Sequence, residues 1–159
     1  PIIRAGLIEA MTGCSDLRPH GLDNPAEAVG ELSRVKPDVA VLDLSLETIS
    51  GQDLIGDIRT HAPRTKVLVF SSFDERVFAR RVFRAGAAGF LPKTAPVQDV
   101  IRAVRDVARG GLSYGDTVLQ NEGPSGSDEP GDVLSNRELD VFLLLGRGLS
   151  PQDISGKLC

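Results

Sequence analysis

The chain has 159 residues, of which 41% are hydrophobic, and a net charge of −4 at neutral pH. This length suffices for one full domain and part of a second, and no apolar stretch approaches the roughly 20 residues of a membrane span. The two cysteines, Cys14 and Cys159, make neither a disulfide framework nor a metal motif. We therefore expect a cytoplasmic protein without membrane spans, whose overall charge gives no sign of nucleic-acid binding.

Apolar residues in the first 109 positions follow alternating helical and extended patterns. Helices are expected where they recur every three or four positions, and strands where they form short unbroken runs. These patterns predict helices at 1–8, 24–35, 52–59, 75–85 and 96–109, and strands at 18–22, 38–44, 66–71 and 88–91. Repeated strand–helix units of this length predict a parallel, doubly wound α/β sheet. A domain of this type normally opens with a strand, which is absent before the first helix here.

Three polar residues follow or end apolar runs of the predicted sheet. Asp43 follows one run, Ser71 ends the next, and Lys93 follows the last. Ligands of such sheets bind outside the carboxyl ends of the strands, so these side chains are expected to meet at one edge. A carboxylate, a hydroxyl and an ammonium suit phosphoryl chemistry, with Asp43 as the nucleophile and the other two balancing charge on the phosphoryl oxygens.

A second, smaller unit is expected after residue 132. Residues 121–132 are rich in Gly, Pro, Ser and acids, a composition typical of a linker. Ser135 and Glu138 form a capping box before an apolar helix, and Ser150 with Asp153 caps another. Two short helices joined by a glycine-containing turn are compatible with a helix-turn-helix.

These motifs together resemble a bacterial two-component response regulator with a LuxR-type (NarL/FixJ-like) DNA-binding domain. In the first unit the resemblance rests on residues 37–46, 67–72 and 84–93, with Gly51 eight residues after Asp43. In the second it rests on residues 134–154. The resemblance implies a flavodoxin-like (CheY-like) receiver at 1–112 with its first strand missing, a linker at 113–132, and the N-terminal part of an all-α LuxR-type domain at 133–159.

The resemblance also implies roles for individual residues. Asp43 would accept a phosphoryl group from a sensor histidine kinase, with Mg²⁺ bound by Asp43 and the main-chain carbonyl of Ser45. Ser71 would be the hydroxyl that moves toward the phosphoryl group, and Lys93 would pair with it. Phe90 occupies the position of an aromatic switch residue, and plain core packing is an equal interpretation of it. The implied partners are the kinase, promoter DNA and a second copy of the chain, and no membrane is implied.

The sequence departs from the family pattern at three places. The acidic pair that the family carries at the end of its first strand, which completes the metal site, is not in this sequence. Glu47 stands where the family often has proline. No recognition helix follows Cys159, so the DNA-reading residues are unknown.

Two alternatives remain open at this point. One is a phosphorylation-independent receiver that acts as a dimerisation or ligand-binding module of a transcription factor. The other is a small α/β enzyme that uses Asp43 as its nucleophile, although the sequence carries neither a glycine-rich phosphate loop nor a nucleophile elbow. We expect a protein that is not an enzyme.

Overall fold

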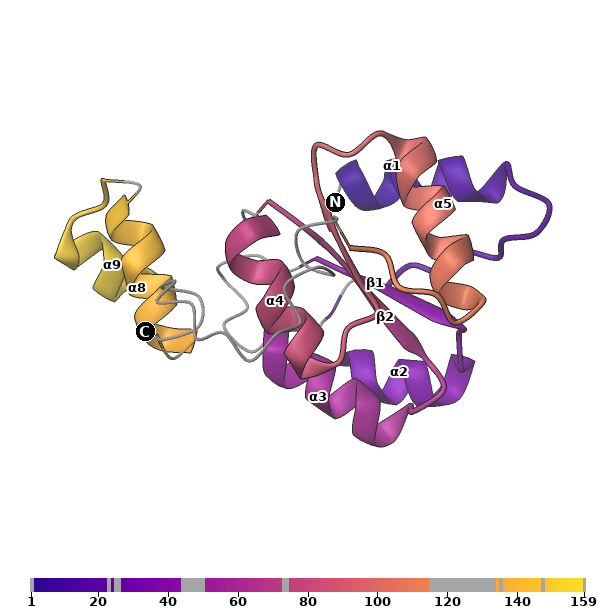
Figure 1. Ribbon diagram of the computed structural model, residues 1–159, viewed down its shortest axis with the longest axis horizontal. Helices are drawn as coiled ribbons and strands as arrows, with labels where there is room; N and C mark the ends of the chain where they lie inside the picture. The colour runs from indigo at the N-terminus through magenta and orange to yellow at the C-terminus, as the bar shows by residue number, and fades with distance from the viewer. Residues whose placement is uncertain are drawn as a thin grey trace.

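The computed structural model describes residues 2–22, 24, 27–43, 51–72, 75–114, 134, 136–146 and 148–158. Within these ranges, two helices come first, strands and helices then alternate from residue 39 to residue 108, and two more helices follow (Figure 1). The helices are α1 (Ile2–Thr12), α2 (Ala28–Val35), α3 (Gly51–His61), α4 (Glu75–Ala85), α5 (Val97–Ala108), α8 (Asn136–Gly146) and α9 (Pro151–Leu158). The strands are β1 (Val39–Leu42), β2 (Lys66–Ser71) and β3 (Gly89–Pro92). Across these ranges, no helix has both the length and the apolar character that crossing a membrane requires.

The three strands form one parallel sheet in the order β1-β2-β3. Val41 of β1 lies opposite Leu68 of β2, and Phe70 of β2 lies opposite Leu91 of β3. Helices α2, α3 and α4 cover one face, and α1 and α5 cover the other (Figure 1). This three-layer arrangement is the predicted doubly wound α/β fold.

The central strand β2 explains why the core has two halves. Side chains alternate between the faces of a strand, so Val67 and Val69 enter one cluster, while Leu68 and Phe70 enter the other. We call the half under α2, α3 and α4 the α4-side cluster and the half under α1 and α5 the α5-side cluster. All four side chains are at most 5% exposed. An apolar run buried on both faces is typical of the central strand of a parallel sheet.

The predicted strand at residues 18–22 is wrong: this segment is described and has no regular structure. A strand forms only where its backbone groups find a ladder partner. β1 pairs with β2, and no strand pairs with its other edge in the described ranges. The segment is held instead by side chains: Arg4 Nη1 donates to the carbonyl of Leu22 at 2.7 Å, and His20 Nε2 lies 3.1 Å from Glu31 Oε1.

Gly86 ends α4 as the sequence predicts, and the reason is a close approach. Its φ of +99° lies in the left-handed region, which side chains with a Cβ disfavour. The Arg59 side chain crosses from α3, and its Nη1 donates to the carbonyl of Ala85 at 3.0 Å. A Cβ at position 86 would overlap Arg59 Cδ. The glycine therefore makes room for the arginine that caps α4.

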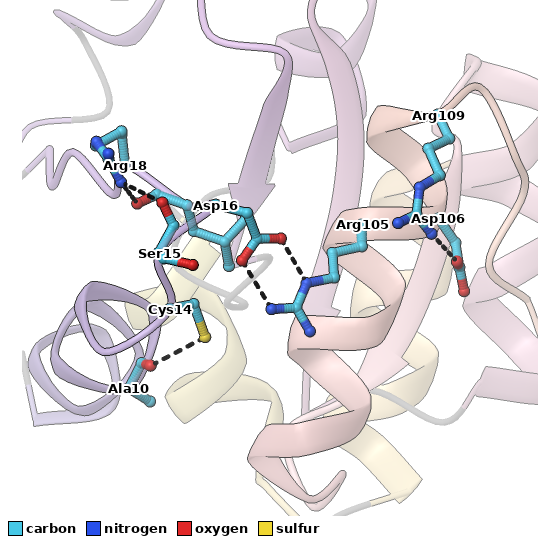
Figure 2. A network of polar contacts seen from close by, with 9 residues as sticks. Ala10, Cys14, Ser15, Asp16, Arg18, Arg105, Asp106 and Arg109 are labelled. Atoms are coloured by element: carbon cyan, nitrogen blue, oxygen red, sulfur yellow. Dashed lines mark hydrogen bonds and ion pairs between the residues drawn. The ribbon is translucent and has the colours of Figure 1, made fainter.

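On the face of the sheet that α1 and α5 cover, an ion pair joins the segment after α1 to α5 (Figure 2). Arg105 donates from Nε to Asp16 Oδ2 at 2.8 Å and from Nη2 to Asp16 Oδ1 at 2.9 Å. This two-pronged hydrogen bond lowers the pKa of Asp16 to about 2. Planar, bidentate pairs of this kind add geometric specificity to the charge attraction.

Helices α8 and α9 form what we call the C-terminal unit, which lies to one side of the sheet beyond α4 (Figure 1). Ser150 and Asp153 form the predicted cap of α9: Ser150 Oγ donates to Asp153 Oδ2 at 2.6 Å, and the Asp153 amide donates back to Ser150 Oγ at 3.3 Å. Leu144 and Ile154 are the buried pair between the two helices. Ser135, of the other predicted capping box, lies outside the described residues.

Candidate functional site

The carboxyl edge of the sheet brings two of the predicted side chains into direct contact. Asp43 follows β1 and Lys93 follows β3, fifty residues further along the chain. Lys93 Nζ donates to Asp43 Oδ2 at 2.5 Å. Since the strands are parallel, their ends lie at one edge, and this geometry follows from the topology.

The backbone of β2 and β3 fixes where Lys93 stands. Ser71, the last residue of β2, lies opposite Pro92, and its carbonyl accepts a hydrogen bond from the Lys93 amide at 2.8 Å. Amides alternate sides along a strand, so the position of Pro92, like the Phe90 amide, faces away from β2. The missing donor of Pro92 therefore interrupts no bond to β2, and the ladder continues as far as Lys93.

The two charged groups differ in how much water reaches them. The Asp43 side chain is 54% exposed, whereas the Lys93 side chain is 18% exposed. A mostly covered lysine side chain thus holds one oxygen of a carboxylate that remains open to a reactant. Such a carboxylate can act as a nucleophile, and the fixed ammonium can balance negative charge that arrives beside it.

Ser71 of β2 and Phe90 of β3 are buried within the domain near this edge. Ser71 is fully buried at the end of β2, and Phe90 is 1% exposed in the α4-side cluster. The structure therefore places Phe90 in the core. Ser45 and Glu47 lie outside the described residues.

The described residues do not complete a metal site. Receiver domains bind Mg²⁺ at their phosphorylation site, and Mg²⁺ requires an octahedral set of oxygen ligands. Asp43 supplies one carboxylate at this edge. No group of three or more His, Cys, Asp or Glu side chains that could hold an ion occurs in the part of the chain that the structure describes.

Two residues at the expected start of the linker pack on this domain, a contact that no sequence pattern indicated. Ser113 pairs with Gly89 at the outer edge of β3. The Tyr114 hydroxyl donates to the carbonyl of Ala87 at 2.7 Å, and its ring meets Phe83 edge-on with centroids 5.4 Å apart. The chain thus returns from α5 along β3 before it leaves the sheet.

A three-layer parallel domain with an Asp–Lys pair at its strand ends defines the receiver class of signalling domains. The chain belongs to this family: the model of the response regulator receiver domain matches residues 1–105.

Similar proteins agree with this assignment. Response regulator GacA of Pseudomonas aeruginosa is 29% identical over 164 residues, which cover 99% of this chain and 77% of GacA. The receiver domain of a putative NarL regulator from Mycobacterium tuberculosis is 31% identical, with a TM-score of 0.63 over 69% of this chain and 90% of that one. A LuxR family DNA-binding response regulator from Silicibacter pomeroyi is 26% identical, with a TM-score of 0.61 over 73% of this chain and 90% of that one.

These findings confirm the resemblance to two-component response regulators of the NarL/LuxR type and the CheY-like fold class. Members of this class are transcription regulators and not enzymes. The alternative of a small α/β enzyme is therefore wrong.

Proposed function

We propose that this chain is a DNA-binding transcription regulator that a sensor histidine kinase switches by phosphorylating Asp43. The observation that carries the proposal is the pair at the carboxyl edge. Asp43 is open to a reactant, and Lys93 holds one of its oxygens at 2.5 Å. Response regulators of this kind interact with histidine kinases and DNA.

The proposed step is a transfer from a phosphohistidine to the carboxylate. An Asp43 oxygen attacks phosphorus, a P–O bond forms, the P–N bond breaks, and the imidazole nitrogen leaves with the bonding electron pair and takes up a proton. The product is an acyl phosphate. Phosphoryl transfer depends on positioning and charge neutralisation. In this proposal, the Lys93 ammonium balances the negative charge on the phosphoryl oxygens. Ser71, buried beside the site, is proposed to supply the hydroxyl that moves toward them.

The proposed domain division follows from the same assignment. Residues 1–112 would form the receiver, 113–132 the linker, and 133–159 the opening helices of the DNA-binding domain. Two short helices that bury Leu144 against Ile154 fit the start of a helix-turn-helix. Promoter DNA and a second copy of the chain are the proposed partners, and Mg²⁺ is the proposed cofactor.

One observation favours a second candidate, a receiver that works without phosphorylation. Asp43 is already paired with Lys93, and the described residues form no group of three or more His, Cys, Asp or Glu side chains that could hold a metal ion. In this case the receiver would serve as a dimerisation or ligand-binding module of the same transcription factor.

Intact-mass spectrometry after treatment with acetyl phosphate and Mg²⁺ separates the two candidates. We expect the mass to rise by one phosphoryl group and the Asp43→Asn variant to stay unmodified. An unmodified wild-type protein, with circular dichroism showing that it is folded, would reject phosphorylation and leave the second candidate.

A further inference from the structure

The outer side of α5 borders a groove that lies apart from the Asp43–Lys93 edge. The inner side of this helix packs on the sheet through its buried residues, Val100, Ala103, Val104 and Val107. Residues of the outer side, together with Cys14 from the segment after α1, line a groove of about 420 Å³. Pockets that hold small molecules span roughly 300–1,000 Å³. The groove therefore has the size of a small-molecule site.

Three arginines of the groove stand in a row along α5. Arg102, Arg105 and Arg109 follow one another at spacings of three and four residues, which places them on one side of a helix. Asp106 is the one carboxylate among the residues that line the groove. The lining thus carries a net charge of +2, although the whole chain carries −4. A positive groove on an acidic chain favours an anionic ligand.

The two outer arginines are held only by exposed pairs within their own helix. Arg102 Nη1 lies 3.1 Å from Asp99 Oδ1, and Arg109 Nη1 lies 3.7 Å from Asp106 Oδ1. The two arginine side chains are 72% and 75% exposed. Pairs of this kind contribute little to stability. An anion can therefore compete with these carboxylates for the guanidinium groups without a change in the fold.

Arg105, in contrast, is held in a fixed position. Asp16 accepts hydrogen bonds from its Nε and Nη2, and Cys14 lies next to its guanidinium (Figure 2). Nη1 takes no part in the pair with Asp16, so it is available to a ligand. Ile101 adds a partly buried apolar side chain one turn earlier on the helix. The groove thus offers positive charge at one end and apolar surface at the other.

We propose that this groove binds a small phosphate ester that carries an aromatic ring, of the size of a mononucleotide. Arg105 and Arg109, one turn apart, bind the phosphate oxygens. The ring packs on Ile101 and on the guanidinium plane of Arg102, since arginine also stacks on aromatic rings. The site uses neither Asp43 nor Lys93, so this inference is independent of the proposed phosphorylation.

Thiol alkylation of the full chain tests the proposal with AMP as the probe. Cys14 and Cys159 are the two cysteines of the sequence. Cys14 lines the groove, so bound AMP should slow its reaction with iodoacetamide, while Cys159 serves as the internal reference. We expect the Cys14 rate, read by peptide mass spectrometry, to fall about tenfold when AMP is at ten times its Kd, because only the unoccupied protein reacts. The Cys159 rate should stay the same.

Two variants of the groove should shift the Kd for AMP in opposite directions. Arg109→Gln loses a phosphate contact and should raise the Kd about tenfold or more, as for the loss of one charge-assisted hydrogen bond. Asp106→Asn removes the competing carboxylate and should lower the Kd about two- to fivefold, a gain that a damaged fold does not produce. Arg34→Gln is the matched control, because Arg34 is 69% exposed on α2 and pairs with Glu31 of the same helix. It should leave the Kd unchanged.

Several results would overturn the proposal. One is a Cys14 rate that millimolar AMP leaves unchanged, and another is a Kd that neither groove variant alters. Equal protection by adenosine, which lacks the phosphate, or by inorganic phosphate, which lacks the ring, would reject the proposed ligand class. Protection that rises with protein concentration alone would assign the groove to a second copy of the chain. Asp43 phosphorylation enters none of these measurements, so a failure here is distinct from a failure of the proposed function.

Discussion

The receiver and the C-terminal unit differ in how they are stabilised. The receiver encloses a sheet between helices, and its two clusters bury side chains of β2, β3 and helices on both faces, with partly buried side chains of β1 packed against them. The described part of the C-terminal unit buries two side chains, Leu144 and Ile154, while Phe142 and Leu145 remain 50% exposed. The packing of the receiver alone is therefore sufficient to keep Asp43 and Lys93 in contact. The segment just before the C-terminal unit, in contrast, is held from outside that unit: Arg81 Nη2 of α4 donates to the carbonyl of Leu134 at 2.6 Å.

The largest expected effect comes from making the same change in both regions. Leu68→Ala removes a fully buried side chain of β2 and should lower the free energy of unfolding of the receiver by about 2–5 kcal/mol. Leu144→Ala removes a side chain that is 2% exposed in the C-terminal unit, and it should leave the receiver transition unchanged. Urea denaturation followed by circular dichroism measures both. An equal loss in the main transition for Leu144→Ala would mean that the two regions unfold as one unit.

A smaller effect is expected at the end of α4. Gly86→Ala places a Cβ at positive φ and against Arg59, so it should destabilise the receiver by about 1–3 kcal/mol. Gly56→Ala is the matched change: position 56 lies inside α3 with no neighbouring atom within 4 Å of the added Cβ. It should be neutral or stabilise by up to about 1 kcal/mol. Equal urea midpoints of unfolding for Gly86→Ala and Gly56→Ala would contradict the inference that position 86 requires a glycine.

The smallest effect is a pH dependence at Asp16, on the α5 side of the receiver. Its pKa of about 2 in the folded chain lies below the unfolded value of about 3.9. Stability from the pair with Arg105 is therefore present above pH 4 and lost as the pH falls toward 2. Thermal unfolding between pH 2 and 6 should show a difference between wild type and Asp16→Asn that shrinks over this window. Asp106→Asn, which breaks the pair with Arg109 at 3.7 Å, serves as the control. A difference that is constant with pH would contradict the assignment.

The sequence predicted the features that follow from short-range patterns. Apolar runs located β1, β2 and β3, and the parallel topology then brought Asp43 and Lys93 to one edge. The strand predicted at 18–22 was wrong, because a strand depends on a neighbouring ladder and not on composition alone. The roles of the site residues remain predictions.

Contacts between distant residues were beyond the sequence patterns. In the sequence, Arg81 is one of several arginines on a basic helix face, and nothing near it pointed to Leu134. Asp16 and Arg105 are 89 residues apart and meet only because α1 and α5 cover the same face. Such pairs depend on the packing of whole elements, which periodicity does not encode.

The return of the chain along β3 has a consequence for how the protein behaves at high concentration. The Phe90 amide donates to the Ser113 carbonyl at 2.8 Å, and the Ser113 amide donates to Ala88 at 2.9 Å. Backbone groups that would otherwise template the addition of a foreign strand are thereby occupied. The protection depends on Gly89, because a Cβ there would lie 2.6 Å from the Ser113 carbonyl oxygen. A single methyl group at position 89 would therefore push the return segment away and open this edge to fibril-like association.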